Sequence, residues 1–346
     1  MSIIATVLAR ELCDGRGGAA LEVEVRTESH ASGRALIPSE QSGGGARRTE
    51  VMLGPALLGM DALDQPAIDA VLREADAGAE GQPDAAAVLA LSVAVARAAA
   101  DVTELPLWRY LGGAAARTLP VPWVTLRRGR QGEGGLHVAA VPHAPATFAL
   151  ALRTARAVCA AARPADDDAD DARALEHATL AITTAADTAA VGGAMRLALA
   201  PRSSAADDRA LAELCQRFAI AWLVDPCPAD ALARWRALRG ALDLDVGLAS
   251  ASAAALGASA QVIEATRTGT VSELLAASGA ARDAGRRPIL DAGTACDDPF
   301  VADLAVAVGA MAVVAEPTMR GGAPVWNELL RIAWSLGEGA LYAGRR

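Results

Sequence analysis

From Leu119 to its end, the chain repeats one unit, a short apolar run followed by a stretch of helical periodicity. We expect strands at Val121–Leu126, Leu180–Ala186, Ala219–Asp225, Leu242–Leu248, Ala260–Ala265, Arg287–Asp291 and Met311–Ala315. We expect helices between them, for example at Ala205–Gln216, Ala229–Leu238, Thr270–Ala284 and Pro299–Gly309. Repeated strand–helix units predict a parallel (β/α) barrel, and a doubly wound open sheet is the alternative that this pattern allows.

The segment before the barrel has a different pattern. Apolar and polar residues alternate through Ile3–Glu11, Leu21–Arg26 and Arg34–Pro38, which predicts a three-stranded antiparallel meander. Helical periodicity follows at Pro66–Ala75, Asp84–Asp101 and Pro106–Leu111. Strands followed by helices predict an α+β cap domain over residues 1–117, and the barrel then occupies residues 118–346.

Composition restricts the class of partner. The net charge of −9 and the pI of about 5.1 argue against nucleic acid and anionic membranes, because either would need a basic face. We therefore expect a small anionic ligand or a protein partner. The 5 cysteines show no CxxC spacing, and Arg10 and Glu11 interrupt any signal-peptide core, so we expect a cytoplasmic protein.

Lysine is absent, so all 32 basic residues are arginines. A guanidinium stays charged near neutral pH, which removes every mechanism that needs a side-chain amine able to lose its proton. The clustered carboxylates of the acidic run Asp166–Asp171 are typical of a metal site, but the run lacks the glycine turn and terminal glutamate of a calcium loop. We interpret it as a solvated loop. His30, His143 and His177 show no ligand spacing with one another.

Eight phrases, taken together and in order, resemble the enolase family. They are ARELCDGRG at Ala9–Gly17, GRALIPS at Gly33–Ser39, MDALDQPAID at Met60–Asp69, LALSVAVARAAA at Leu89–Ala100, PLWRYLGG at Pro106–Gly113, LPVP at Leu119–Pro122, FVADLAVA at Phe300–Ala307, and NELLRI with LYAGR at Asn327–Ile332 and Leu341–Arg345. The resemblance implies an α+β cap before a (β/α) barrel, and a homodimer. The chain is shorter than full-length enolases, mainly around Arg127–Ala146 and Ala161–Leu175.

The resemblance also shows which catalytic groups are replaced. The family removes a proton next to a carboxylate with a lysine base and stabilises the enolate with Mg²⁺. The lysine of a phrase like LIKVNQIGT becomes Glu264, and the second lysine, of a phrase like IKTG, aligns with Val313. In the HRSGE phrase the histidine becomes Asp291 and the arginine becomes Ala292. The acidic DEGG loop has no counterpart.

The metal ligands of the family are replaced as well. Three carboxylates, each at a barrel strand end, hold its first Mg²⁺, and their positions fall at Thr183, at Val224 and at or beside Ala249. A hydroxyl, an isopropyl and a methyl group cannot replace hard, charged oxygen ligands. We therefore expect no metal site and no cofactor, although Asp225 stays beside the second position.

A few residues keep the family pattern. Ser39 and Ser42 remain in the mobile-loop phrase SEQSG, and His137 matches a family histidine in the phrase GGLH. We interpret the serines and Asp225 as turn and cap residues rather than as a remnant site.

Three hypotheses follow. The first is an enolase homologue that has lost dehydration of 2-phosphoglycerate and is retained for a binding or structural role. The second is an enzyme: either a lyase rebuilt from Glu264, Asp291 and His137, or a nominal phosphopyruvate hydratase of glycolysis. The third is a drifted sequence with no selected role.

Overall fold

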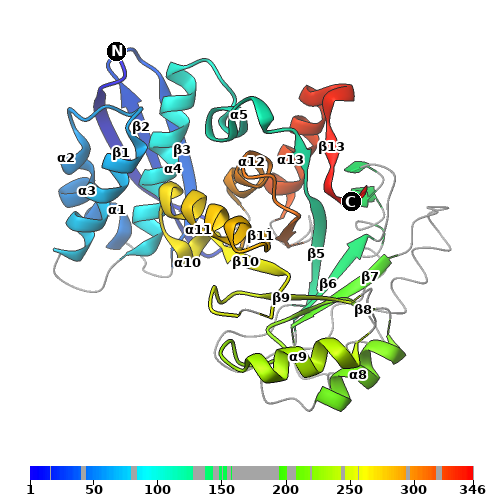
Figure 1. Ribbon diagram of the computed structural model, residues 1–346. Coiled ribbons are helices and arrows are strands. Elements are labelled where there is room, and N and C mark those ends of the chain that lie inside the picture. Colours follow the sequence, from blue (N-terminus) through cyan, green and yellow to red (C-terminus); the bar gives the residue numbers. More distant parts are fainter. Residues whose placement is uncertain are drawn as a thin grey trace.

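A computed structural model describes residues 1–15, 17–39, 44–78, 84–127, 137–142, 148–149, 151–153, 157, 195–200, 208–218, 220–242, 246–255, 257–293, 297–316 and 322–345. It has two parts, a three-stranded sheet with helices at the N-terminal side and a closed barrel (Figure 1). Some predicted features lie outside the described residues, namely the strand Leu180–Ala186, the acidic run Asp166–Asp171, Ser42 and Thr183.

The predicted antiparallel meander is confirmed, with strand order β1-β2-β3. Its strands are β1 (Ile4–Cys13), β2 (Ala19–Thr27) and β3 (Ser32–Pro38). The helices that follow are α1 (Gly44–Arg48), the π-helix η1 (Thr49–Leu53), α2 (Gly54–Leu57), α3 (Gln65–Ala77), α4 (Ala85–Val102), α5 (Leu107–Gly112) and the 3₁₀ turn η2 (Gly113–Ala115). Asp64 and Asp84 set the N-terminal ends of α3 and α4, because their carboxylates accept hydrogen bonds from the backbone N–H groups of Ala67 and Ala87.

Helix α4 packs against β3 at very short range, and its small side chains make this contact possible. A methyl group added at Gly33 would lie 2.0 Å from the carbonyl oxygen of Ala94. Glycine on the strand and alanines on the helix therefore bring the two backbones together. By length and composition α4 could span a membrane, but 72% of it is buried inside the protein, as expected for a core helix.

The predicted barrel is confirmed, because eight strands of the described chain close in the order β10-β11-β12-β5-β6-β7-β8-β9. They are β5 (Val121–Arg127), β6 (His137–Pro142), β7 (Met195–Ala200), β8 (Ile220–Val224), β9 (Gly247–Ser250), β10 (Ala260–Glu264), β11 (Arg287–Asp291) and β12 (Ala312–Ala315). The barrel differs from an all-parallel one, since β6 runs antiparallel to both β5 and β7.

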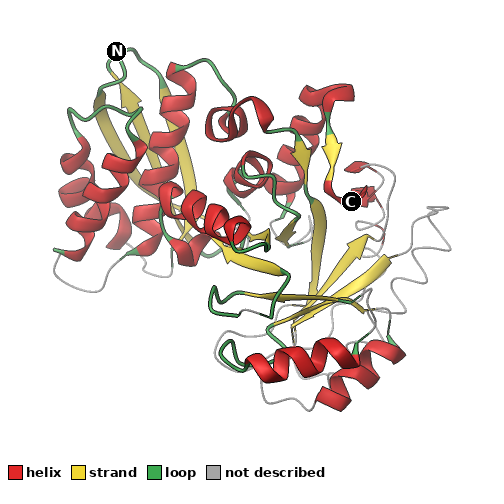
Figure 2. Cartoon of the chain, viewed as in Figure 1, coloured by secondary structure: helices red, strands yellow, loops and turns green. Residues whose placement is uncertain are grey.

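Helices lie along the outside of several barrel strands, drawn in red beside the yellow strands in Figure 2. They are α8 (Asp208–Arg217), α9 (Leu232–Ala241), α10 (Ala265–Thr268), α11 (Val271–Asp283), α12 (Phe300–Ala307) and α13 (Ala323–Leu336), and the remaining elements are β4 (Thr118–Leu119), the 3₁₀ turns η4 (Gly337–Gly339) and η5 (Ala343–Arg345), and β13 (Leu341–Tyr342). One apolar core is shared by the N-terminal sheet and most of the barrel. A second core lies between β7–β9 and the helices α8 and α9.

Buried polar contacts join the N-terminal part to the barrel at the start of α11. The Asp69 carboxylate accepts a hydrogen bond from the backbone N–H of Ser272 at 2.9 Å, and the Ser92 hydroxyl accepts one from the N–H of Val271 at 2.9 Å. These two N–H groups belong to the first turn of α11, where helix donors have no partner in the helix. Side chains from α3 and α4 therefore complete the N-terminus of a barrel helix.

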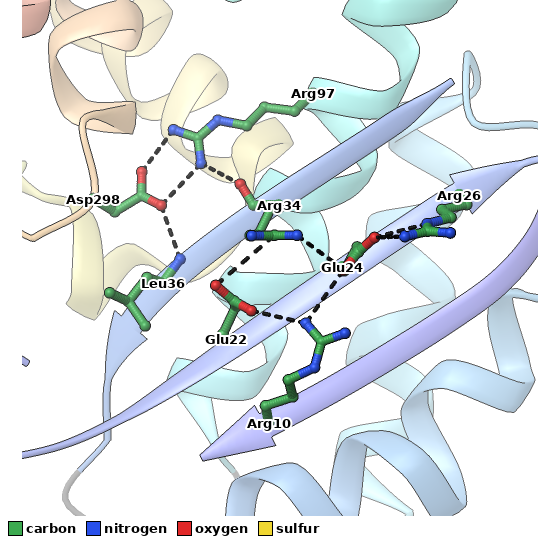
Figure 3. A network of polar contacts seen from close by, with 8 residues as sticks. All are labelled: Arg10, Glu22, Glu24, Arg26, Arg34, Leu36, Arg97 and Asp298. Carbon is green, nitrogen blue, oxygen red and sulfur yellow. Dashed lines mark hydrogen bonds and ion pairs between the residues drawn. The ribbon is translucent and has the colours of Figure 1, made fainter. Parts of the chain in front are cut away.

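A second joint between the N-terminal part and the barrel involves Arg97 of α4 (Figure 3). The Arg97 guanidinium binds both oxygens of the Asp298 carboxylate, at 2.7 and 2.9 Å, and the same carboxylate accepts the backbone N–H of Leu36 at 2.9 Å. Asp298 is buried and lies two residues before the first residue of α12. A carboxylate from the barrel thus connects both α4 and β3, which fixes the N-terminal part beside the barrel mouth.

Candidate functional site

The carboxyl ends of the parallel strands define the mouth of the barrel, where barrel enzymes place their chemistry. Strand β8 ends at Val224, and its Cα is paired in register with Ala249 of β9. Strand β7 lies directly before β8 in the barrel and ends at Ala200. Three neighbouring strands therefore carry aliphatic residues at these positions.

Asp225 follows β8 and binds the start of the next loop rather than the barrel interior. Its backbone adopts a left-handed conformation with φ of 48°, and its carboxylate accepts the hydroxyl of Ser250 and the backbone N–H of Ala251 at 3.2 Å. These contacts agree with the interpretation of Asp225 as a turn residue.

Glu264 and Asp291 end two neighbouring strands, and their Cα atoms are paired in register. Asp291 is 8% exposed and accepts the backbone N–H of Gly293 at 2.8 Å. Glu264 accepts the hydroxyl of Thr266 at 3.2 Å, and the Arg267 guanidinium lies 3.8 Å from its other oxygen. The register therefore places the two residues side by side on neighbouring strands, but only Asp291 lines the cavity described next.

A cavity of about 40 Å³ opens at the mouth, next to Asp291. The described residues that line it are Trp123, Ala139, Ala198, Ala200, Val224, Val262, Asp291 and Val314. Asp291 is the only charged residue in this set, and Glu264 is not a member. A cavity of this size holds a few non-hydrogen atoms, whereas pockets for larger ligands measure about 300–1,000 Å³.

The second lysine position of the family is also aliphatic in the structure. Val313 is fully buried, and its neighbour Val314 lines the cavity. Alternation along a strand places these two residues on opposite faces, so the inward-facing residue of β12 is a valine. Neither residue can accept or donate a proton.

The residues at the strand ends do not fit a magnesium ion. Mg²⁺ needs near-octahedral oxygen ligands with negative charge, and Ala200, Val224 and Ala249 offer only hydrocarbon side chains. Within the described part of the chain, no group of three or more His, Cys, Asp or Glu residues is arranged to hold a metal. No step that uses a metal is derived for this site.

The remaining predicted residues are dispersed. His137 begins β6, where its backbone pairs with Ala200 at the mouth end of β7. Ser39 follows β3, donates its backbone N–H to the carbonyl oxygen of Ala19 at 3.0 Å and lies beside a separate small pocket. The structure thus places His137 on a mouth strand and Ser39 next to the N-terminal sheet.

Three residues that line the cavity, Trp123, Ala198 and Ala200, were not predicted as site residues from the sequence. A signal for β7 was present, because LALA at Leu197–Ala200 differs by one letter from the LALD phrase of the family. This match puts the position of the aspartate at Ala200 of β7, in place of the assignment to Thr183 made from the sequence.

Comparisons with known proteins agree with this architecture. Residues 47–111 match the enolase N-terminal domain, and residues 203–346 match the enolase C-terminal TIM barrel domain. An enolase from Acidothermus cellulolyticus is 31% identical over 420 aligned positions, covering 99% of this chain and 97% of that protein. Since the chain has 346 residues, at least 420 − 346 = 74 of those positions are gaps in it. The chain belongs to the enolase family.

Proposed function

We propose that this protein does not dehydrate 2-phosphoglycerate and instead serves a binding role on the enolase fold. The observation that carries the proposal is the aliphatic character of the mouth, where Ala200, Val224 and Val314 line the cavity and Ala249 is the register partner of Val224. Removal of a carbon-bound proton next to a carboxylate creates concentrated negative charge, which needs cations to stabilise it. None of the described residues that line this cavity carries a positive charge.

The rebuilt-enzyme alternative is less well supported. It requires Glu264 and Asp291 to face one enclosed space as acid and base. The register places their backbones side by side, but the cavity is lined by Asp291 and Val262, and Glu264 instead contacts Thr266 and lies near Arg267. The non-catalytic proposal therefore agrees better with the geometry.

Turnover of 2-phosphoglycerate tests the proposal. Purified protein, 2-phosphoglycerate and Mg²⁺ are incubated, and formation of the enol product is followed by its ultraviolet absorbance. The enolase of Acidothermus cellulolyticus, assayed in parallel, is the positive control. We expect the rate to equal that of a buffer blank, and a rate well above the blank would refute the proposal.

We also propose that the protein is a cytoplasmic homodimer. The outer face of the N-terminal sheet supports this, because Leu8 and Leu12 are each 41% exposed there. They lie beside a network in which Glu24, itself 4% exposed, binds three arginines (Figure 3). Light scattering should give twice the chain mass of 35.1 kDa, and a mass of one chain would contradict the proposal.

A further inference from the structure

Helix α5 follows α4 in the chain and lies before the barrel strand β5, so it belongs to the link between the two parts of the molecule (Figure 1). It packs closely on α12. A methyl group added at Gly112 of α5 would lie 2.5 Å from the Cα of Ala307, so the two helix backbones are in near contact. Trp108 of α5 is 4% exposed. The link is therefore held on the barrel by a contact that excludes water.

The Asp303 carboxyl group is buried in this contact without an ion-pair partner. Asp303 lies on α12, is 6% exposed, and accepts the backbone N–H of Trp108 in the first turn of α5. Arg97 instead binds both oxygens of Asp298. Within the described part of the chain, no arginine forms an ion pair with Asp303. A buried carboxylate without a paired cation is costly, which favours the protonated form of Asp303.

The charges around Asp303 also favour the proton. Burial has the largest effect on the pKa of Asp303 and raises it. The Arg97 charge lowers this pKa, whereas the carboxylates of Glu328 and Asp298 raise it, and the resulting pKa is about 7. Glu328 pairs with Arg331, whose side chain is 68% exposed, so solvent screens that cation. The other charged or titratable residues on the described elements that pack against α12, none of which bonds to Asp303, are Arg109 and Tyr110 of α5 and Arg287 and Asp291 of β11.

We propose that the contact between α5 and α12 is a pH-sensitive device, closed while Asp303 is protonated and opened when Asp303 is ionised. In the closed state the carboxyl group keeps its proton up to about pH 7, whereas in an open state that admits water it loses the proton above about pH 4. The closed state therefore loses stability relative to the open state as the pH rises from about 4 to about 7. Arg97 and Asp298 stay paired in both states, so only the link is released. This inference is independent of the proposed function, because it does not involve the barrel mouth.

Hydrogen–deuterium exchange of the backbone amides of α5 tests the device in the full chain. Exchange is measured at pH 5 and pH 8 by mass spectrometry, and each rate is divided by the intrinsic rate at that pH. We expect the corrected rate to rise about eightyfold, because the carboxyl group titrates near pH 7 in the closed state and near pH 4 in the open state. Low concentrations of urea should leave this rate unchanged, because a local opening exposes little surface. Exchange of α5 that depends on urea as strongly as exchange of α4 would overturn the device, because α5 would then open only with the whole chain.

Three variants assign the pH response to Asp303. Asp303→Asn should make the corrected exchange rate of α5 independent of pH, whereas the matched control Asp283→Asn, at an exposed position on α11, should keep the eightyfold rise of the unmodified chain. Glu328→Gln should move the pH at which the rate stops rising to a lower value, because Glu328 disfavours ionisation of Asp303. A purely structural loosening would raise the rate at every pH without moving that point. A constant rate in the unmodified chain, or an undiminished rise in Asp303→Asn, overturns the device.

Discussion

Replacing Asp298 by alanine should destabilise the protein more than any surface ion-pair substitution. The carboxylate accepts two hydrogen bonds from the Arg97 guanidinium, at 2.7 and 2.9 Å, and one from the N–H of Leu36 at 2.9 Å (Figure 3). It accepts a fourth from the N–H of Phe300 at 2.8 Å. Asp298 is 4% exposed, so water cannot replace it freely. The substitution leaves the Arg97 charge and two backbone donors without this acceptor.

The expected loss follows from these contacts. Breaking a buried ion pair by removing one partner costs about 3–5 kcal/mol. Arg97 also interacts with the charges of Asp303 and Glu328, which compensate part of its charge after the substitution. We therefore expect the lower part of that range, about 3 kcal/mol of unfolding free energy. Asp298→Asn, which keeps one acceptor oxygen, should lose less.

Urea unfolding followed by circular dichroism at neutral pH measures this loss. Glu213→Ala is the matched control, because it removes a carboxylate whose partner Arg209 lies 3.0 Å away and both side chains are exposed, at 63% and 86%. An exposed pair of this kind contributes less than about 0.5 kcal/mol. A loss below about 1 kcal/mol for Asp298→Ala, or equal losses for both variants, would refute the role of Asp298 as the joint.

Other predictions concern the same contact region. Burial raises the pKa of Asp303 to about 7. The folded chain therefore keeps a proton on Asp303 that the unfolded chain releases above about pH 4. The contribution of this proton to the unfolding free energy is present at low pH and is lost as the pH rises through 7. Urea unfolding should therefore show that the stability of the unmodified chain relative to Asp303→Asn falls by about 2 kcal/mol between pH 5 and pH 8, and a constant difference would contradict this assignment. Ser92→Ala should cost about 1–3 kcal/mol of unfolding free energy, because the buried N–H of Val271 loses its acceptor, and an unchanged urea midpoint would speak against the contact. Gly33→Ala should lower the thermal midpoint by several degrees, because the new methyl group meets the Ala94 carbonyl oxygen, and a retained midpoint would show that α4 can move away.

Periodicity alone predicted most of the fold. The meander, α3, α4 and most barrel strands were found because their apolar residues repeat at strand or helix spacing over their whole length. The residues His137–Pro142 and Met195–Ala200 were not predicted as strands. Both are only 6 residues long, each contains two alanines, which have a low strand propensity, and neither alternates apolar and polar residues along its length. The antiparallel direction of β6 also has no local signal, because direction depends on partners far along the chain.

The candidate site was predictable in its chemistry but less so in its geometry. The replacements at Val224, Ala249 and Val313 follow from the sequence phrases, and the structure places the first two on neighbouring strands. That Val314 rather than Val313 faces the cavity depends on the pleat of β12, which the phrase does not specify. The role of Trp123 as a wall of the cavity depends on closure of the whole barrel.

Calorimetric titration with Mg²⁺ tests the central claim most directly, because the claim is that the mouth lacks metal ligands. The unmodified chain should give no saturable heat, with or without 2-phosphoglycerate. The triple variant Ala200→Asp, Val224→Glu and Ala249→Asp, which returns carboxylates to three neighbouring strand ends, should gain Mg²⁺ binding and a rise in its thermal midpoint with Mg²⁺. Saturable Mg²⁺ binding by the unmodified chain that depends on 2-phosphoglycerate would contradict the account.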